Sequence, residues 1–200
     1  MDHLSREDIE IEFDRAQDLY TKKNHAAALP ILQRLADLGY APAYFKLAQY
    51  EFYSGDRQVA QQWLARLEAA GDRGNAHACY LCYLAYRGGW TGQGRVVNNP
   101  IGSLYLLRAA ELGHTYAQYT LAQELRSGAN DQTKSEAGYL HWIEKAITGG
   151  SDDAIYDHIK WLDQKGRSIH PSLMADLDVL AQEWPNAAKL RDKLKRRTQR

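Results

Sequence analysis

The side chains of this 200-residue chain that could do chemistry are two cysteines and seven histidines. Cys79 and Cys82 stand three residues apart within a predicted helix, so they could touch, but the chain offers no second cysteine pair for a zinc site. The surrounding sequence also lacks the βαβ pattern of a thioredoxin-like redox site. We therefore expect two buried, inert thiols.

The histidines give no stronger signal for a metal or catalytic site. They occupy positions 3, 25, 77, 114, 141, 158 and 170, and none forms the HxxxH or HExxH pattern of a metal-binding helix. Only ligands contributed by different helices could build such a site. The chain also has no GxSxG, P-loop or dinucleotide fingerprint. The expectation is a protein without catalytic residues, metal or cofactor, which is not an enzyme.

Composition and charge narrow the class further. Lys plus Arg equals Asp plus Glu at 25 each, so no net field draws the chain toward nucleic acid or lipid. Apolar residues make up 44% of the chain, which is enough for a substantial core. The opening residues, MDHLSREDIEIEF, are acidic and lack the apolar region of a secretory signal. No stretch approaches the roughly 18 apolar residues of a membrane span. We expect a cytoplasmic protein.

The elements that would position any site are helices arranged in a repeat. Residues 108–128 and 34–55 read almost alike, about 74 positions apart. Four glycines follow Ala/Leu-rich runs and suit the left-handed residue that closes a helix: Gly39, Gly71, Gly113 and Gly150. Four alanines open a second pattern, with spacings of 35, 39 and 37 residues: Ala43, Ala78, Ala117 and Ala154. This period indicates a helical solenoid.

Helix-start signals agree with the repeat. Asp56 can cap the helix that follows it, Asn99 precedes Pro100, and Ser5 with Asp8 resembles a capping box. No alternating strand pattern of useful length is present. We expect about eleven helices, with one long flexible connection at residues 88–94.

Small residues should allow these helices to approach one another closely. The alanines concerned are Ala43, Ala48, Ala117 and Ala122. Leu47 and Leu121 would fill the space beside them and are expected to be buried.

Residues 88–128 resemble the Sel-one-like repeat, a relative of the tetratricopeptide repeat. The matching elements are Gly92-x-Gly94-x-Val96, Asn98-Asn99-Pro100, Arg108-Ala109-Ala110-Glu111-Leu112-Gly113 and Ala117-Gln118-Tyr119-x-Leu121-Ala122. The resemblance covers roughly residues 25–166. Gly102 stands where the family usually has alanine, and His158-Ile159 replaces a Leu-small pair in the fourth unit. We expect a single domain over residues 1–200, with an N-terminal helix at 5–24 and capping helices at 167–200.

The resemblance implies an all-α fold, a right-handed superhelix of about four antiparallel helix pairs with terminal capping helices. Members of the family generally act as non-catalytic adaptors or scaffolds that bind other proteins. Some bacterial members are immunity proteins that neutralise a cognate toxin enzyme by direct binding. The expected function is therefore that of an adaptor or scaffold in a cytoplasmic complex of a bacterium, with the immunity role as the alternative.

The resemblance also implies that the first helix of each pair lines a concave face. Positions two, six and nine residues beyond the repeat alanines then predict a partner-binding surface made of Phe45, Gln49, Phe52, Tyr80, Arg87, Tyr119, Gln123, Arg126 and Tyr156. Tyr and Arg are the residue types that carry most binding energy at protein interfaces. The alternative for the aromatic residues is a framework role in packing between adjacent repeats.

The C-terminal residues have a different charge from the rest. Residues 189–200 hold seven basic residues and one acid, a net charge of +6, so the rest of the chain carries −6. The basic residues proposed for the tail are Lys189, Arg191, Lys193, Lys195, Arg196 and Arg197. They could bind an acidic protein, nucleic acid or anionic lipid, or form a solvent-exposed helix end. A homo-oligomer through the solenoid ends is left open, as is the role of Trp142, Trp161 and Trp184 in the core or at an interface.

Overall fold

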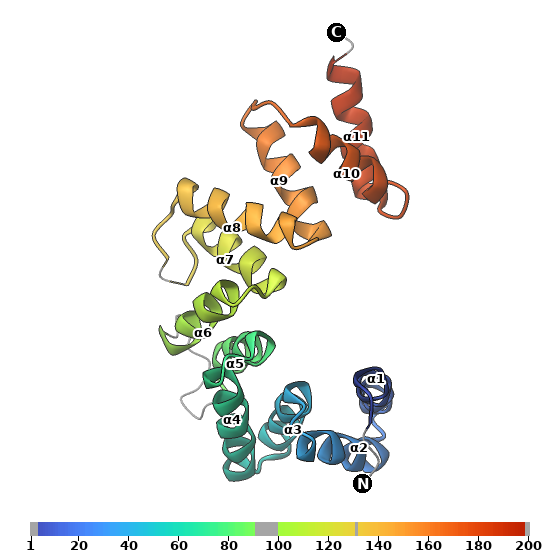
Figure 1. The fold of residues 1–200 in the computed structure, drawn as a ribbon, viewed down its shortest axis with the longest axis vertical. Coiled ribbons are helices and arrows are strands. Elements are labelled where there is room, and N and C mark those ends of the chain that lie inside the picture. Colours follow the sequence, from blue (N-terminus) through green and yellow to red (C-terminus); the bar gives the residue numbers. More distant parts are fainter. Residues whose placement is uncertain (1–3, 91–99, 131, 199–200) are drawn as a thin grey trace. The chain divides into compact units, whose positions relative to one another are not determined.

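The computed structural model describes residues 4–90, 100–130 and 132–198, and within them the chain forms eleven α-helices and no strand (Figure 1). The chain divides into two compact units, Met1–His114 (unit 1) and Thr115–Arg200 (unit 2). Unit 1 holds α1 (Arg6–Thr21), α2 (His25–Asp37), α3 (Ala41–Ser54), α4 (Arg57–Asp72), α5 (Ala76–Gly88) and α6 (Pro100–Glu111). Unit 2 holds α7 (Thr115–Ser127), α8 (Glu136–Thr148), α9 (Asp152–Gln164), α10 (Pro171–Leu180) and α11 (Pro185–Thr198). The all-helical prediction is confirmed, and the single domain over 1–200 stays a prediction.

The predicted helix starts are present where they can be described. Ser5 and Asp8 form the reciprocal capping box of α1, and Asp56 accepts a hydrogen bond from the backbone N–H of Val59 at the start of α4. Pro100 is the first residue of α6, as expected. Residues 91–99, which include much of the predicted flexible connection and the Asn99 cap, lie outside the described residues.

Three of the four predicted terminating glycines close a helix, and one does not. Gly39, Gly113 and Gly150 have φ of +84°, +88° and +83°, which is the left-handed conformation. Gly71 lies inside α4, and the turn is made at Gly74 with φ +90°. A Cβ on Gly71 would lie 3.2 Å from the Sγ atom of Cys79, so glycine there allows α4 and α5 to approach closely.

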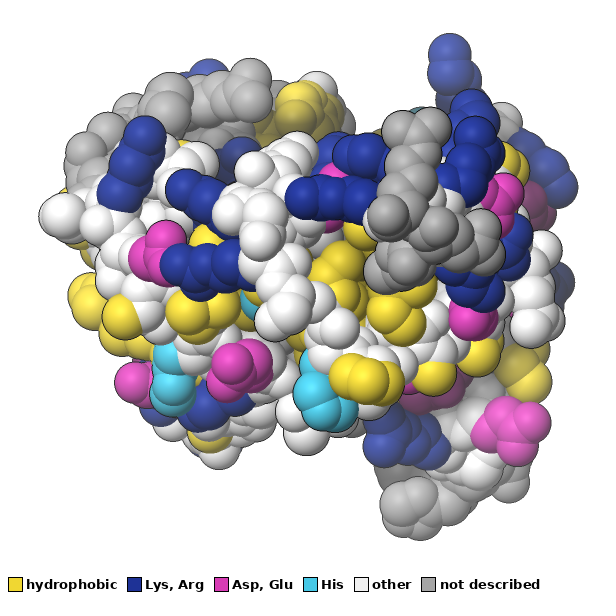
Figure 2. All heavy atoms as spheres, turned by 90° about the horizontal axis from the view of Figure 1, so that it is seen from above, with side chains coloured by type: hydrophobic (Ala, Val, Ile, Leu, Met, Phe, Trp, Pro, Cys, Tyr) yellow, Lys and Arg dark blue, Asp and Glu magenta, His cyan; other side chains and the backbone are white. Residues whose placement is uncertain are grey.

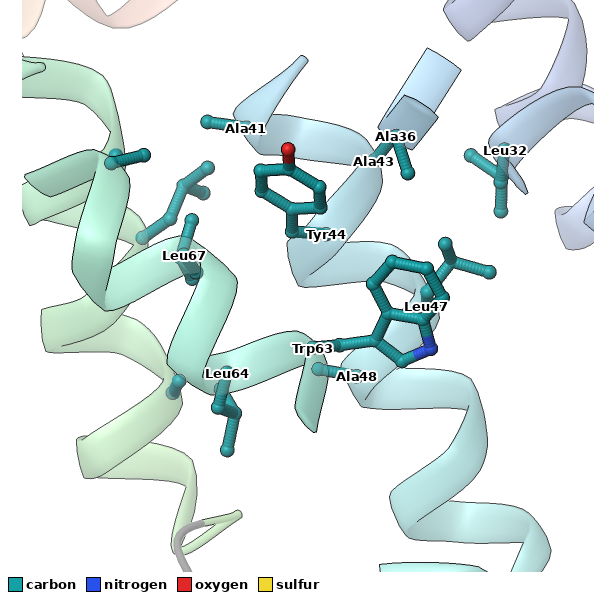
Figure 3. Close-up of a cluster of buried hydrophobic side chains, with 14 of the residues drawn as sticks. Leu32, Ala36, Ala41, Ala43, Tyr44, Leu47, Ala48, Trp63, Leu64 and Leu67 are labelled. Atoms are coloured by element: carbon teal, nitrogen blue, oxygen red, sulfur yellow. The ribbon is translucent and has the colours of Figure 1, made fainter. Parts of the chain in front are cut away.

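Helices pack chiefly against their neighbours in sequence, and in unit 1 the first helices of successive repeats, α3 and α5, also touch. The unit 1 core contains Leu32, Leu47, Leu67 and Tyr44, with the Tyr44 ring stacked on Trp63 at 6.1 Å between centroids (Figure 3). Tight helix contact depends on small residues, and Ala43, Ala48, Ala78, Ala117, Ala122 and Ala154 all have no exposed surface. Leu47 and Leu121 are each 3% exposed, so their predicted burial is confirmed.

Unit 2 has two clusters of buried residues. The first contains Tyr139, Ile143 and Trp161, with Trp142 packed against it. The second is formed by α9, α10 and α11 through residues Ile155, Ile159, Leu177, Leu180, Ala187 and Leu194, with Trp184 packed against it. Of the three tryptophans that the sequence left unassigned, Trp161 lies in the core, while Trp142 and Trp184 pack against it and are partly exposed. Among the described residues, no helix has both the length and the apolar character needed to cross a bilayer.

Candidate functional site

The predicted binding residues of unit 1 lie on α3 and α5, and the aromatic ones pack against their own unit. Phe45 is half-buried, and its ring lies 4.8 Å from that of buried Trp90, which follows α5. Tyr80 stacks on His114 with 4.7 Å between ring centroids and an interplanar angle of 19°. These rings fill space within unit 1, so the structure gives them a packing role. Their contact with a partner stays a prediction.

Two further residues of α3 lie closer to solvent. Phe52 is half-buried, with the guanidinium carbon of Arg57 5.7 Å from its ring centroid and Tyr53 edge-on to it. Gln49, one turn earlier, is half-buried on the same helix.

Arg87 at the end of α5 is exposed and held in place by its own helix. Its Nη1 atom donates a hydrogen bond to the hydroxyl of Tyr83 at 2.8 Å, and its Cζ atom lies 5.9 Å from the ring centroid of Tyr83. Tyr83 is only 4% exposed. The guanidinium therefore starts from a fixed orientation on a buried ring, while its outer face meets solvent.

In unit 2 the equivalent column is joined by hydrogen bonds around Asp157. The hydroxyl of Tyr119 and the side-chain amide of Gln123, both on α7, donate to the same Oδ2 atom of Asp157 on α9, each at 2.7 Å. Burial, the hydrogen bond to Asp157 and its charge raise the pKa of Tyr119. Sequence reasoning missed Asp157, because only the folded arrangement places it opposite two residues about 35 positions earlier.

Arg126 is the unit 2 counterpart of Arg87 and is also exposed. Its guanidinium carbon lies 5.6 Å from the ring centroid of Tyr139, which has no exposed surface. Burial raises the pKa of Tyr139 to about 12, although the charge and hydrogen bond of Arg126 oppose the shift. Both predicted arginines thus lie on buried tyrosine rings, but Tyr83 comes from the same helix and Tyr139 from the next one.

A small cavity of about 200 Å³ opens beside Arg126. Its lining includes Lys134 and Lys165, along with the buried rings of Tyr139 and Trp161. Sequence reasoning missed both lysines, because one follows α7 in a connecting segment and the other caps the end of α9. The cavity is therefore lined by three cationic side chains and two buried aromatic rings, an arrangement suited to binding a carboxylate.

Tyr156, the last member of the predicted column, packs near the C-terminal helices. It is half-buried, and its ring lies edge-on to Trp184 at 6.3 Å between centroids. The ammonium of Lys160 is 5.9 Å from the Tyr156 ring centroid.

The predicted basic tail lies on α11, and several of its charges are paired within unit 2. Lys193 and Arg197 contact the carboxylate of Asp163 at 2.6 and 3.0 Å, and the Asp163 side chain is only 5% exposed. Lys195 contacts Asp178 at 2.8 Å. These pairs attach α11 to α9 and α10, and partner binding by the tail stays a prediction.

The two thiols are placed as expected. Cys79 and Cys82 are buried and form no disulfide, and burial raises the pKa of both. The Cys79 thiol also donates to the carbonyl of Gly71. A thiol held in its protonated form is a poor nucleophile. Over the part of the chain that the structure describes, no group of three His, Cys, Asp or Glu side chains could hold a metal ion.

Comparison with known proteins places the fold. No protein-family model matches the chain, and no curated protein matches it either. A Sel1 repeat protein from Oxalobacter formigenes aligns with a TM-score of 0.56 and 21% identity over 84% of this chain and 69% of that one. A protective antigen of uropathogenic Escherichia coli strains, which displays an SLR (Sel1-like repeat) fold, aligns with a TM-score of 0.53 and 17% identity. That match covers 85% of this chain and 36% of the antigen, so the chain spans about a third of its length. The resemblance read from the sequence is thereby confirmed at the level of the fold, and the chain is an all-α helical repeat protein with the Sel1-like repeat fold.

Proposed function

We propose that the chain is a non-catalytic protein-interaction module, an adaptor or scaffold that binds an acidic region of a partner protein through the first helices of its repeats. Helical repeat folds of this kind typically present extended surfaces to other proteins. The free, buried thiols fit a reducing compartment, which supports a role in the cytoplasm.

The observation that carries the proposal is the shared placement of Arg87 and Arg126. Both are exposed, both occupy the same position of the repeat, and both guanidinium groups lie on tyrosine rings that are nearly or fully buried. Holding an arginine in place before binding lowers the side-chain entropy lost when a partner docks. Arginine is also among the residues that contribute most to binding energy at protein interfaces.

The cations beside Arg126 indicate which chemistry the partner should offer. Lys134 and Lys165 line the same cavity, and the one carboxylate in that lining, Glu136, forms an ion pair with Arg167. A guanidinium can bind a carboxylate through two parallel hydrogen bonds. The surface around Arg126 therefore favours an aspartate or glutamate of the partner.

The test compares exposed arginines that all lie over an aromatic ring but belong to different helices of the repeat. Arg87→Ala and Arg126→Ala are made singly and together, with Arg66→Ala as the control. Arg66 is also exposed and lies 4.7 Å over the ring of Trp63, but it is on α4, a second helix of a repeat. Partners captured from the native organism with the wild-type chain are identified, purified and titrated against each variant.

Truncating a central arginine at an interface costs about 2 kcal/mol or more, a loss in affinity of roughly 30-fold. We expect that loss for Arg126→Ala, a further loss for the double variant, and no significant loss for Arg66→Ala. Unchanged affinity of the double variant would contradict the proposal.

The same purified partner distinguishes an adaptor from an immunity protein. A single partner that is an enzyme, binds one to one and loses activity on binding would make the chain an immunity protein. Several partners of moderate affinity, none of them inhibited, would make it a scaffold. An immunity gene is also expected to lie beside the gene of its toxin.

A further inference from the structure

A second cavity of unit 2 is lined by neither Arg87 nor Arg126, the arginines of the proposed function. It has a volume of about 450 Å³ and is formed by the end of α9, the connection to α10, and α10 and α11. Its apolar walls are Ile169, Met174 and Leu194. It is open at the surface, and its size admits a branched aliphatic side chain.

The rim of this cavity is positively charged. Arg167, Lys195 and Arg197 line it together with a single carboxylate, Asp163, so the lining itself carries a net charge of +2. Arg167 and Lys195 also form ion pairs with two exposed carboxylates outside the lining, Glu136 and Asp178, so a partner's carboxylate would compete with these pairs for the two cations. The Asp163 side chain is 5% exposed and forms ion pairs with Arg197 and Lys193, which compensate its charge. The side chains of the three lining cations are between 45% and 63% exposed. Figure 2 shows a face of the molecule on which Lys and Arg side chains border hydrophobic ones.

A surface with the opposite charge, and with a projecting apolar side chain in place of a cavity, lies on α1. Ile11 is 59% exposed, so its aliphatic side chain projects from the acidic face of this helix into solvent. Helical spacing places four exposed acidic residues on the same face around it: Glu7, Glu10, Asp14 and Asp18. Arg6 pairs with Glu10 and Lys22 with Asp18, which leaves two carboxylates on this face without an ion pair to any described cation.

We propose that this cavity binds α1 of a second copy of the chain, with Ile11 seated between the apolar walls and the surrounding carboxylates against the basic rim. The two surfaces complement each other in both shape and charge, a projecting apolar side chain in an acidic ring and an apolar cavity with a cationic rim. The charge of the chain is divided in the same sense, because residues 189–200 carry +6 and the rest carries −6.

The contact joins two different surfaces of the chain, so two copies can exchange it reciprocally in a two-fold dimer or pass it head to tail into longer assemblies as concentration rises. One side chain in one cavity buries less surface than a stable interface needs, roughly 1,000 Å². The association is therefore weak, and because its rim is charged and exposed it weakens as salt is added.

The first experiment tests the pairing directly. A copy carrying Ile11→Cys is mixed with a copy carrying Met174→Cys under mild oxidation, and disulfide-linked species are mapped by mass spectrometry. The native cysteines do not interfere, since both are buried. The control replaces Met174→Cys with Val179→Cys, which is on the same helix and 64% exposed but does not line the cavity.

We expect a linked pair joining positions 11 and 174, at a yield several-fold above that of the Val179→Cys control. Equal yields would overturn the proposal. A chain carrying both Ile11→Cys and Met174→Cys gives a second readout. If it forms the disulfide within one molecule regardless of dilution, the occupant is the chain's own α1, which also overturns the proposal.

The second experiment uses charge and leaves the cavity walls intact. Sedimentation velocity measures self-association of the wild-type chain over a range of concentrations at low and high salt. Lys195→Glu reverses a charge on the rim, and Lys189→Glu makes the same change on the same helix away from the cavity. We expect Lys195→Glu to weaken self-association about tenfold and Lys189→Glu to change it by less than about twofold.

Reversing the charge on both surfaces should restore the contact. Glu10→Lys weakens self-association alone, and a mixture of Glu10→Lys with Lys195→Glu copies associates again. Asp37→Lys on α2, an exposed acid outside the proposed surface, serves as the control for α1. The proposal fails if the wild-type chain is monomeric at every concentration, or if both lysine variants behave alike. It also fails if the cavity binds only an acidic segment of another protein.

Discussion

Phe45 in unit 1 and Tyr119 in unit 2 occupy the same position of the repeat, two residues beyond a fully buried alanine, yet they are held in different ways. Phe45 packs against an apolar cluster that includes Leu81. Tyr119 donates a hydrogen bond to Asp157. Leu81 and Asp157 also share a repeat position, three residues beyond the alanine that begins the next pattern.

In these two units both positions are apolar in one case and both are polar in the other. A phenylalanine is matched by a leucine in one unit, and a tyrosine by a carboxylate in the other. The backbone arrangement of the repeat accepts either pair, because an apolar contact and a fully bonded polar contact both avoid a buried polar group without a partner. Mixed pairs should be worse than either matched pair.

The largest expected effect comes from removing core volume in one unit. Leu47→Ala in unit 1 removes a side chain that is 3% exposed and should lower the free energy of unfolding by about 2–5 kcal/mol. Because repeat proteins are stabilised by contacts between neighbours, hydrogen exchange should rise mainly in unit 1. Leu104→Ala is the control, at a position 67% exposed, and should have little effect. Equal loss of protection in both units would show that they unfold together.

The next effect concerns the matched pairs. Tyr119→Phe removes the hydroxyl that donates to Asp157, leaving the carboxylate with Gln123 as its remaining donor within the column. Hydrogen bonds to charged groups contribute about 1.5–3 kcal/mol, so chemical denaturation should show a loss of that size or less. Tyr53→Phe, at a position 69% exposed, should be nearly neutral.

A double variant sharpens this result. Tyr119→Phe with Asp157→Leu gives unit 2 the apolar pair found in unit 1 and should recover part of the stability lost by Tyr119→Phe alone. Replacing both partners of a hydrogen bond by apolar groups is often close to neutral. A double variant less stable than the sum of its single changes would contradict the idea of matched pairs.

Features with a helical period could be predicted from the sequence, and features that depend on contacts between repeats could not. The alanines and leucines of the repeat were placed correctly because burial follows directly from position on a helix. Gly71 was wrongly assigned as a helix terminator. Its function is the close approach to Cys79 on the next helix, which the run of residues leading up to it does not reveal.

The same limit applies to the candidate site. The exposed position of Arg87 and Arg126 follows from the repeat, but the rings beneath them come from different helices. Lys134 and Lys165 reach the Arg126 cavity from a connecting segment and from the end of α9, where no periodic pattern operates. Such residues are found only when the helices are placed in space.

Lowering the pH should destabilise unit 1 more than unit 2, and this difference should be smaller than the effects described above. In unit 1 burial and the neighbouring imidazole of His77 lower the pKa of His114 to about 4 from its ordinary 6.5, and burial lowers the pKa of His77. The unfolded chain binds these protons more readily, so their contribution to stability is complete above about pH 6.5 and is lost as the pH falls toward 4. In unit 2 burial lowers the pKa of one imidazole, that of His158.

Two facing imidazoles should make unit 1 the more acid-sensitive unit. Hydrogen exchange measured across this pH range should show unit 1 opening first, and Tm should fall by several degrees, since about 1 kcal/mol corresponds to 4–8 °C for a unit of this size. His114→Gln should make the fall of Tm with pH shallower. Earlier opening of unit 2, or an unchanged slope in the variant, would reverse the comparison.

Replacing Arg87 or Arg126, the residues expected to contribute most to binding, should have the smallest effect on stability. Arg87 and Arg126 are exposed, so losing their contacts with Tyr83 and Tyr139 should cost roughly 0.5–1 kcal/mol, the range of exposed cation–π contacts. Thermal unfolding of Arg87→Ala and Arg126→Ala measures this directly, with Arg66→Ala as the matched control. Replacing Arg126 should cost slightly more stability than replacing Arg87, because its ring belongs to another helix and the contact joins α7 to α8.

Lysine at either position keeps the charge but cannot bind a carboxylate through two hydrogen bonds. Such a variant should therefore keep the stability of the wild-type chain and still bind a partner more weakly. An arginine whose removal destabilised its unit by several kcal/mol would be part of the framework, and a loss of binding in that variant could then be explained by unfolding alone.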